Sequence, residues 1–175
     1  MKKNKPIKTV GLIANPQHAT ETGLVRKAAD LITDSGRKLM VDQTTVNATG
    51  VDGITLPNAA ELARLCDLML VIGGDGTVLQ VARKTAGSNT PILGINSGRL
   101  GFFTSASEES LEEGLENLWR GKYIVDPLPL IEATGKHAGK KYKVLALNDI
   151  LISRGANPRL VELEVAMDGE ALTQY

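Results

Sequence analysis

Hydrophobic and polar residues alternate with two different spacings along the first two thirds of the chain. Short apolar runs, typical of strands buried on both faces, occupy residues 7–14, 38–43, 67–72 and 91–96. Apolar residues at helical spacing predict helices over residues 21–36, 58–66, 77–87 and 110–121. A polar segment with Gly50, Gly53 and Pro57 connects the second strand to the second helix. Strands that alternate with helices in this way predict an α/β fold, a doubly wound, Rossmann-like domain over residues 1–122.

The pattern changes from Tyr123 onward. Residues 123–135, 140–155 and 160–175 read as strands separated by turn residues, and no segment among them has a helical pattern. The sequence MDGE predicts a tight hairpin, because an Asp-Gly pair tolerates positive φ angles. We expect residues 123–175 to begin an all-β domain. A few strands with an open edge make a poor domain, so we also expect the sequence to be a fragment of a longer protein.

Composition and charge narrow the class of protein. Lysine plus arginine and aspartate plus glutamate number 20 each, so no global field favours nucleic acid or an anionic membrane. No apolar run approaches the roughly 18–20 residues that span a bilayer. The single cysteine, Cys66, excludes an internal disulfide, and with two distant histidines it provides no metal-ligand cluster. We expect a cytoplasmic protein that binds neither nucleic acid nor membrane and has no metal site of its own.

The sequence VIGGDGT, residues 71–77, directly follows a predicted buried strand. Ligands of an open α/β sheet bind outside the carboxyl ends of its strands, where this loop lies. The three glycines, Gly73, Gly74 and Gly76, let a ligand approach the backbone closely. A helix expected to begin near Thr77 would offer free amides to phosphate oxygens, and the Thr77 hydroxyl can cap that helix or bind phosphate. The loop therefore predicts a phosphate site.

Asp75 is the informative residue of this loop. A carboxylate repels a polyphosphate unless Mg²⁺ bridges the two groups or the carboxylate has another task. One such task is to accept a proton from an attacking hydroxyl group, which then takes a phosphoryl group. The alternative is a tight turn in which Asp75 only caps the helix. The P-loop and G-x-G-x-x-G signatures are both missing from the sequence, which removes the main support for ordinary NTPases and dehydrogenases.

A second glycine-rich stretch, GINSGRLGF at residues 94–102, follows the next parallel strand. It should lie beside the first loop at the same edge of the sheet, with Asn96 as a polar group. The alternative is a crossover loop, and we expect Leu100 and Phe102 to pack into the core. Further along, LNDI places Asn148 and Asp149 next to each other in a predicted strand. At the rim of the sheet this pair could bind sugar hydroxyls or an adenine edge; alternatively, it is an ordinary strand end.

With GGDGT, INSGRLGF and LNDI in this order and spacing, the sequence resembles the bacterial NAD kinases. These enzymes phosphorylate the adenosine-ribose 2′-hydroxyl of NAD, giving NADP, with ATP or in some cases polyphosphate as donor. The resemblance covers essentially the whole chain. GGDGT alone is not specific, because diacylglycerol and sphingosine kinases also carry it, but NSGRLGF followed by LND is much more specific to NAD kinases.

The resemblance implies a set of site residues. Asp75 matches the aspartate proposed to activate the ribose hydroxyl. The matching binding positions for phosphates and NAD are Gly73, Gly74, Gly76, Thr77, Asn96, Phe102, Asn148 and Asp149. Phe102 matches an apolar residue that lines the NAD site, and many relatives have Glu at the position of Asp149. Mg²⁺ or another divalent cation would accompany the ATP.

Members of the family continue past Tyr175 through most of a β-sandwich, which contributes to the NAD site and to a homo-oligomer. The resemblance therefore implies that this sequence is the N-terminal portion of an NAD kinase that is a homo-oligomer at full length. Two alternatives remain. A lipid kinase would share the first glycine loop, but the second glycine motif and the lack of an apolar or basic stretch for a membrane surface argue against it. The chain as given could also be a nucleotide-binding module that catalyses no turnover.

Overall fold

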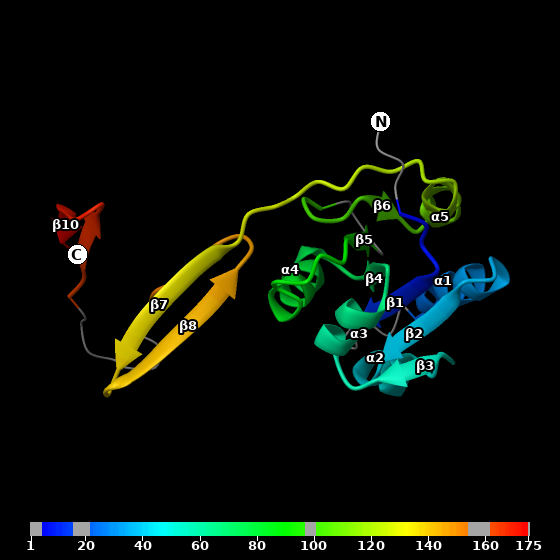
Figure 1. The fold of residues 1–175 in the computed structure, drawn as a ribbon, viewed down its shortest axis with the longest axis horizontal. Helices are drawn as coiled ribbons and strands as arrows, with labels where there is room; N and C mark the ends of the chain where they lie inside the picture. Colours follow the sequence, from blue (N-terminus) through cyan, green and yellow to red (C-terminus); the bar gives the residue numbers. More distant parts are fainter. Residues whose placement is uncertain (1–4, 16–21, 97–100, 154–161, 175) are drawn as a thin grey trace.

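The computed structural model describes residues 5–15, 22–96, 101–153 and 162–174 of the 175-residue chain. Figure 1 shows a sheet between helices, followed by two β-hairpins. Within the described residues the sheet has six parallel strands in the order β3-β2-β1-β4-β5-β6. Their bounds are β1 Thr9–Ala14, β2 Lys38–Asp42, β3 Ile54–Leu56, β4 Leu68–Ile72, β5 Ile92–Asn96 and β6 Ala106–Ser107. The order reverses between β1 and β4, which confirms the predicted doubly wound topology.

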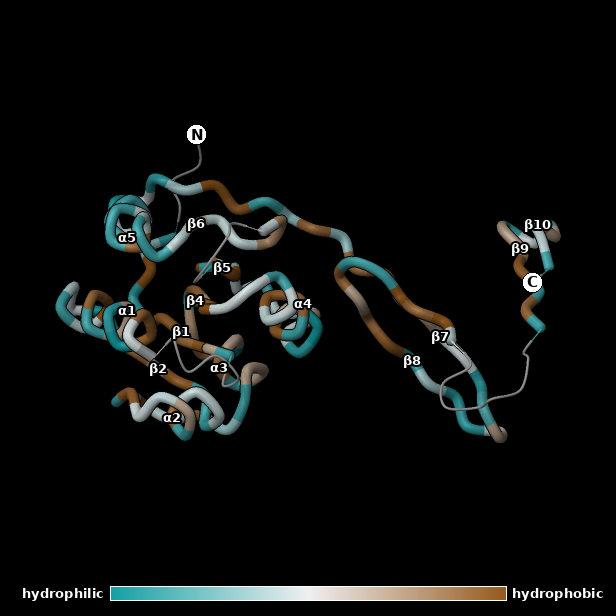
Figure 2. Tube along the Cα trace, turned by 180° about the vertical axis from the view of Figure 1, so that it is seen from behind, coloured by the Kyte–Doolittle hydropathy of each residue, from teal (hydrophilic) through white to brown (hydrophobic). Residues whose placement is uncertain are grey.

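Helices cover both faces of the sheet because its strands are apolar on both. In β4, Leu68, Leu70 and Ile72 pack into one hydrophobic cluster with α1 and α5. The alternate residues of the strand, Met69 and Val71, point to the opposite face and pack with α3 and α4. The helices are α1 Thr22–Asp34, α2 Gln43–Thr49, α3 Ala59–Leu65, α4 Asp75–Lys84 and α5 Leu111–Trp119. Figure 2 shows β1 and β2 as largely hydrophobic segments among helices that carry many hydrophilic residues.

Three short elements were not predicted: α2, β3 and β6. Helix α2 is rich in threonine, a poor helix former, so its sequence carries little helical signal. Its ends are stabilised locally, because the Asp42 carboxylate accepts a hydrogen bond from the Thr45 amide and Gly50 ends the helix with φ 64°. Strands β3 and β6 have three and two residues, too few to show a period. The tertiary structure decides all three elements.

The strands after α5 form two antiparallel hairpins, in agreement with the predicted β domain. The strand predicted from Tyr123 begins only at Ile131, so the prediction of strand over residues 123–130 is wrong. Strands β7 Ile131–His137 and β8 Lys140–Ala146 form one, and β9 Glu164–Met167 and β10 Glu170–Gln174 form the other. Asp168 and Gly169 have φ angles of 53° and 91°, so the Asp-Gly hairpin is confirmed. The two hairpins belong to separate sheets, and Figures 1 and 2 show the first hairpin beside α4. The domain boundary at residue 122 stays a prediction.

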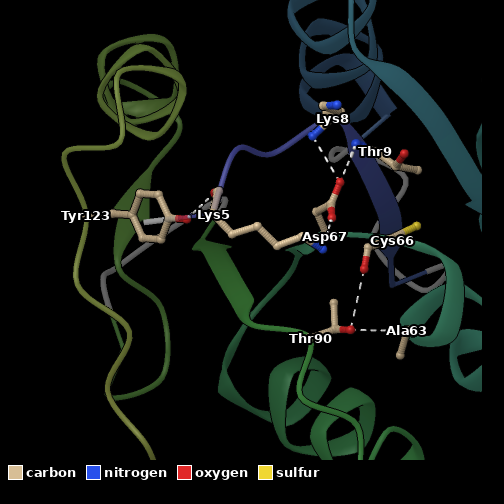
Figure 3. Close-up of polar contacts among 8 residues, drawn as sticks. All are labelled: Lys5, Lys8, Thr9, Ala63, Cys66, Asp67, Thr90 and Tyr123. Carbon is tan, nitrogen blue, oxygen red and sulfur yellow. Dashed lines mark hydrogen bonds and ion pairs between the residues drawn. The ribbon is translucent and has the colours of Figure 1, made fainter. Parts of the chain in front are cut away.

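A polar cluster joins the strands at the amino edge of the sheet (Figure 3). The Asp67 carboxylate, just before β4, accepts hydrogen bonds from the Lys8 and Thr9 amides at 3.0 and 3.1 Å and from Lys5 Nζ at 2.8 Å. The Tyr123 hydroxyl donates to the Lys5 carbonyl oxygen at 3.1 Å, which ties the segment after α5 to the same cluster. Burial by itself would raise the pKa of Asp67, but the hydrogen bonds from Lys5, Lys8 and Thr9 outweigh it and lower that pKa.

We expect Asp67→Asn to lower the free energy of unfolding by about 2 kcal/mol at neutral pH, because an amide cannot replace a carboxylate that accepts three hydrogen bonds. A lowered pKa in the folded state stabilises the fold above the unfolded pKa of about 4, and this contribution is lost as the pH falls through the folded pKa. Urea unfolding at several pH values should therefore show the wild type and Asp67→Asn converging below about pH 4. Asp52→Asn is the control, because Asp52 is exposed and has no polar partner within the described residues. A constant difference at every pH would contradict this role.

Candidate active site

The first glycine loop connects β4 to α4 at the carboxyl edge of the sheet. Gly73 has φ 147°, and a Cβ there would overlap the side chain of Thr77, so the position requires glycine. Its amide donates to the carbonyl oxygen of Ile95 in β5 at 2.9 Å, which links the loop to the neighbouring strand. Gly74 is the N-cap of α4, and its carbonyl oxygen accepts from the Thr77 amide at 2.9 Å. Helix α4 thus begins at Asp75, two residues earlier than predicted.

The Asp75 carboxylate points to the second glycine loop. Its Oδ2 accepts a hydrogen bond from the Phe102 amide, and its Oδ1 accepts one from the Phe103 amide, each at 2.9 Å. No side chain caps α4 at its N-cap, so the alternative in which Asp75 caps the helix is wrong. The carboxylate instead joins two loops that are 27 residues apart in the sequence. The prediction that the two glycine-rich stretches lie side by side is confirmed.

The backbone of the second loop is shaped around this carboxylate. A Cβ on Gly101 would overlap the Asp75 carboxylate, so only glycine leaves room for it. The Gly101 amide donates to Oγ1 of Thr104, which is buried, at 2.9 Å. The Phe102 side chain is 96% exposed, so the expectation that it packs into the core is wrong. The amide of Phe102 is bound to Asp75 while its ring faces solvent; Leu100, also expected in the core, lies outside the described residues.

A cleft of about 610 Å³ lies between α4 and the end of β8, and the start of α4 forms part of its wall. Its walls come from the segments after β1 and β8, from α2 and from one face of α4. The lining residues are Asn15, Thr44, Gly76, Thr77, Leu79, Gln80, Arg83, Lys84, Ala146, Leu147, Asn148 and Asp149. Four of these were predicted as site residues from the sequence.

Asn148 and Asp149 follow β8 rather than lying within it, so the prediction that they belong to a strand is wrong. The ladder between β7 and β8 ends at the pair Ile131 and Ala146. In the same register Asn148 would face Pro129, which has no amide hydrogen to donate. The chain therefore leaves the strand before Asn148 and turns along the cleft.

The structure separates the predicted site residues into two groups. Gly76, Thr77, Asn148 and Asp149 line the cleft. The Asp75 carboxylate, Gly101 and Phe102 meet at the second loop, whereas Asn96 ends β5 and pairs in register with Ser107 of β6. The first glycine loop thus lines the cleft through Gly76 and Thr77 and contacts the second loop through Asp75.

The sequence interpretation missed five polar residues of the cleft: Asn15, Thr44, Gln80, Arg83 and Lys84. The residues on α4 could have been found from their spacing to Gly76, since the helix itself was predicted. The position of Asn15 depends on tertiary contacts, because the buried Thr45 hydroxyl accepts a hydrogen bond from the Ala14 amide at 2.9 Å. The Asn15 amide donates to the Ile72 carbonyl oxygen at 3.3 Å, so β1 and β4 hold it at the cleft.

The cleft suits an anionic ligand. Arg83 and Lys84 are its cationic residues and Asp149 its acidic one. Within the described part of the chain, no three His, Cys, Asp or Glu side chains gather to hold a metal ion. No helix in the described ranges has the length and apolar character needed to cross a membrane.

Comparisons with known proteins point to one family. The family model for the ATP-NAD kinase N-terminal domain matches residues 10–123. An NAD kinase from Cupriavidus pinatubonensis is 35% identical over 165 residues, which cover 94% of this chain and 54% of that protein. An NAD kinase from an Acidovorax species is 37% identical over 147 residues, which cover 83% of this chain and 49% of that protein. The chain spans about half the length of these curated relatives.

Two solved structures have the same fold. The structure of yeast NADH kinase with NADH has a TM-score of 0.78 at 19% identity, and the match covers 98% of this chain and 55% of that one. The structure of an NAD kinase from Archaeoglobus fulgidus with ATP has a TM-score of 0.66 at 23% identity, and the match covers 95% and 56%. The family match extends over β1 to α5 and includes both glycine-rich stretches, which favours NAD kinases over lipid kinases. The chain therefore belongs to the NAD kinase family, with residues 10–123 matching its N-terminal domain.

Proposed function

We propose that the protein transfers a phosphoryl group from ATP to the adenosine-ribose 2′-hydroxyl of NAD, giving NADP. The observation that carries the proposal is the Asp75 carboxylate, which the Phe102 and Phe103 amides hold in one orientation where the two glycine loops meet. A fixed carboxylate next to a phosphate-binding loop suits transfer to an alcohol. Named relatives that are NAD kinases, and a structural neighbour solved with ATP, support the same reaction.

Each group has a defined task in this reaction. The backbone of Gly73 to Thr77 binds phosphate oxygens, with the exposed Gly76 leaving room for close approach. Asp75 takes the proton of the ribose 2′-hydroxyl while the 2′-oxygen forms a bond to the terminal phosphorus of ATP. The bond between that phosphorus and the bridging oxygen of ATP breaks in the same step. Two lone pairs of the carboxylate accept the amide hydrogens, and the others remain for this proton.

The remaining predicted residues orient NAD. Asn148 and Asp149, which line the cleft after β8, bind the ribose and amide regions of the dinucleotide. Phe102 offers an exposed aromatic face beside Asp75 for an apolar contact with NAD. Mg²⁺ or another divalent cation enters as part of the Mg-ATP substrate. We also propose that the protein is cytoplasmic and is a homo-oligomer at full length.

The test is NADP formation from NAD and Mg-ATP by the complete gene product, with polyphosphate as a second donor. We expect NADP to accumulate with ATP. A folded protein that binds ATP but forms no NADP would contradict the proposal and favour the module without turnover. Phosphorylation of diacylglycerol or sphingosine in place of NAD would favour the lipid kinase alternative.

A further inference from the structure

One face of α4 lines the cleft from its first turn to its last. Gly76, Gln80 and Arg83 are separated by four and three residues, so they share a helical face, and Lys84 adjoins Arg83. At about 1.5 Å of rise per residue, Arg83 lies about 10 Å along the helix axis from Gly76. This face leads from the phosphate-binding loop to two cationic side chains, two turns away.

The Arg83 and Lys84 side chains lack a polar partner in the part of the chain that the structure describes. Arg83 and Lys84 are exposed, and within the described residues the side chain of neither makes a hydrogen bond or an ion pair. Asp149, which lines the same cleft, forms no ion pair with them. The ion pairs in the described ranges are Lys5–Asp67, Arg64–Glu61, Arg120–Glu116 and Lys143–Glu132. The donors of Arg83 and Lys84 are therefore available to an anionic ligand in the cleft.

We propose that Arg83, assisted by Lys84, binds the phosphoanhydride chain of the phosphoryl donor. A guanidinium group binds phosphate oxygens in pairs, and its charge offsets the charge that a polyphosphate brings into the cleft. A single phosphate at the start of α4 is too short to reach Arg83 across about 10 Å, whereas a chain of several phosphates along the helix face can contact both ends. ATP and inorganic polyphosphate share this chemistry. The identity of the chain as the donor rests on the proposed function.

The test compares Arg83→Ala with the wild type in the complete gene product. Calorimetry measures binding of Mg-ATP, inorganic tripolyphosphate and orthophosphate, and steady-state kinetics give kcat and the KM values for ATP, polyphosphate and NAD.

We expect the Kd for Mg-ATP and tripolyphosphate to rise about tenfold or more, as for the loss of one charge-assisted hydrogen bond, while orthophosphate binding is unchanged. The KM for ATP should rise and the KM for NAD should stay the same, and Arg83→Lys should restore part of the affinity. If Arg83→Ala weakened ATP binding but changed neither tripolyphosphate binding nor the kinetics with polyphosphate, Arg83 would contact the nucleoside part of ATP, and the proposal would be overturned.

Arg64→Ala is the matched control. Arg64 is an exposed arginine on α3, which packs on the same face of the sheet, but it pairs with Glu61 and does not line the cleft. Equal Kd values for ATP in Arg83→Ala and Arg64→Ala would overturn the inference and leave NAD phosphorylation intact. Wild-type protein that binds tripolyphosphate through Arg83 but forms no NADP would support the inference and contradict the proposed function. Wild-type protein that binds neither ATP nor tripolyphosphate would overturn the inference.

Discussion

Asp75→Asn is expected to lower the rate of NADP formation at least about a hundredfold, the usual range for loss of a general base. The reason is twofold. An asparagine cannot take the proton of the ribose hydroxyl. Its side-chain NH₂ group would also face a backbone N–H group, and two hydrogen-bond donors cannot bond to each other. At most one of the hydrogen bonds from Phe102 and Phe103, each 2.9 Å long in the wild type, can then persist. Steady-state kinetics with saturating NAD and Mg-ATP measure this effect.

Amide hydrogen exchange separates the two consequences of this substitution. Exchange at Phe102 and Phe103 should become faster in Asp75→Asn, whereas exchange in the β4 core should not change. A lower kcat with unchanged exchange at Phe102 and Phe103 would mean that Asp75 acts in proton transfer alone. Faster exchange at these amides with an unchanged kcat would mean that Asp75 only holds the second loop in position. Asp52→Asn, at an exposed position without a polar partner in the described chain, should retain full activity. Full activity in Asp75→Asn would contradict the proposed mechanism.

Gly101→Ala is expected to reduce NADP formation by about a hundredfold, the cost of a misplacement of about 1 Å in an active site. The added Cβ would overlap the Asp75 carboxylate, so either the carboxylate rotates or the second loop moves away. Both outcomes break the contact between the two loops, although neither group is chemically altered. Kinetics and thermal unfolding of the variant together measure the effect. We expect the melting temperature to change little, because Gly101 itself belongs to neither core cluster and only Phe103 of this loop packs against one.

Gly114→Ala is the control for this substitution. Gly114 lies inside α5, and a Cβ there meets no atom within 4 Å. The alanine should leave activity unchanged and stabilise the helix by about 0.5–1 kcal/mol. Normal activity in Gly101→Ala would show that the loop accommodates the methyl group and that the contact with Asp75 is not needed for catalysis.

The order and type of the main elements could be read from the amino-acid sequence. Continuous apolar runs predicted β1, β2, β4 and β5, and apolar residues at helical spacing predicted α1, α3, α4 and α5, because a strand or helix records its buried faces in its own residues. Glycines directly after β4 and β5 placed the candidate site at the carboxyl edge, since a parallel sheet brings these strand ends together. The Asp-Gly hairpin was equally readable, because its turn chemistry is local.

Which side chains and loops come into contact could not be read from the sequence, because it depends on the tertiary fold. The partners of Asp75 lie 27 and 28 residues further along, and an exposed Phe102 looks no different in the sequence from a buried one. Asn148 and Asp149 leave β8 because of the register with the β7 segment, and the cleft exists because that hairpin lies beside α4. Contacts between distant segments leave no periodic signal in either one, since each depends on how the other is placed. For the same physical reason, Arg83 became a candidate only when the structure showed that its face of α4 lines the cleft.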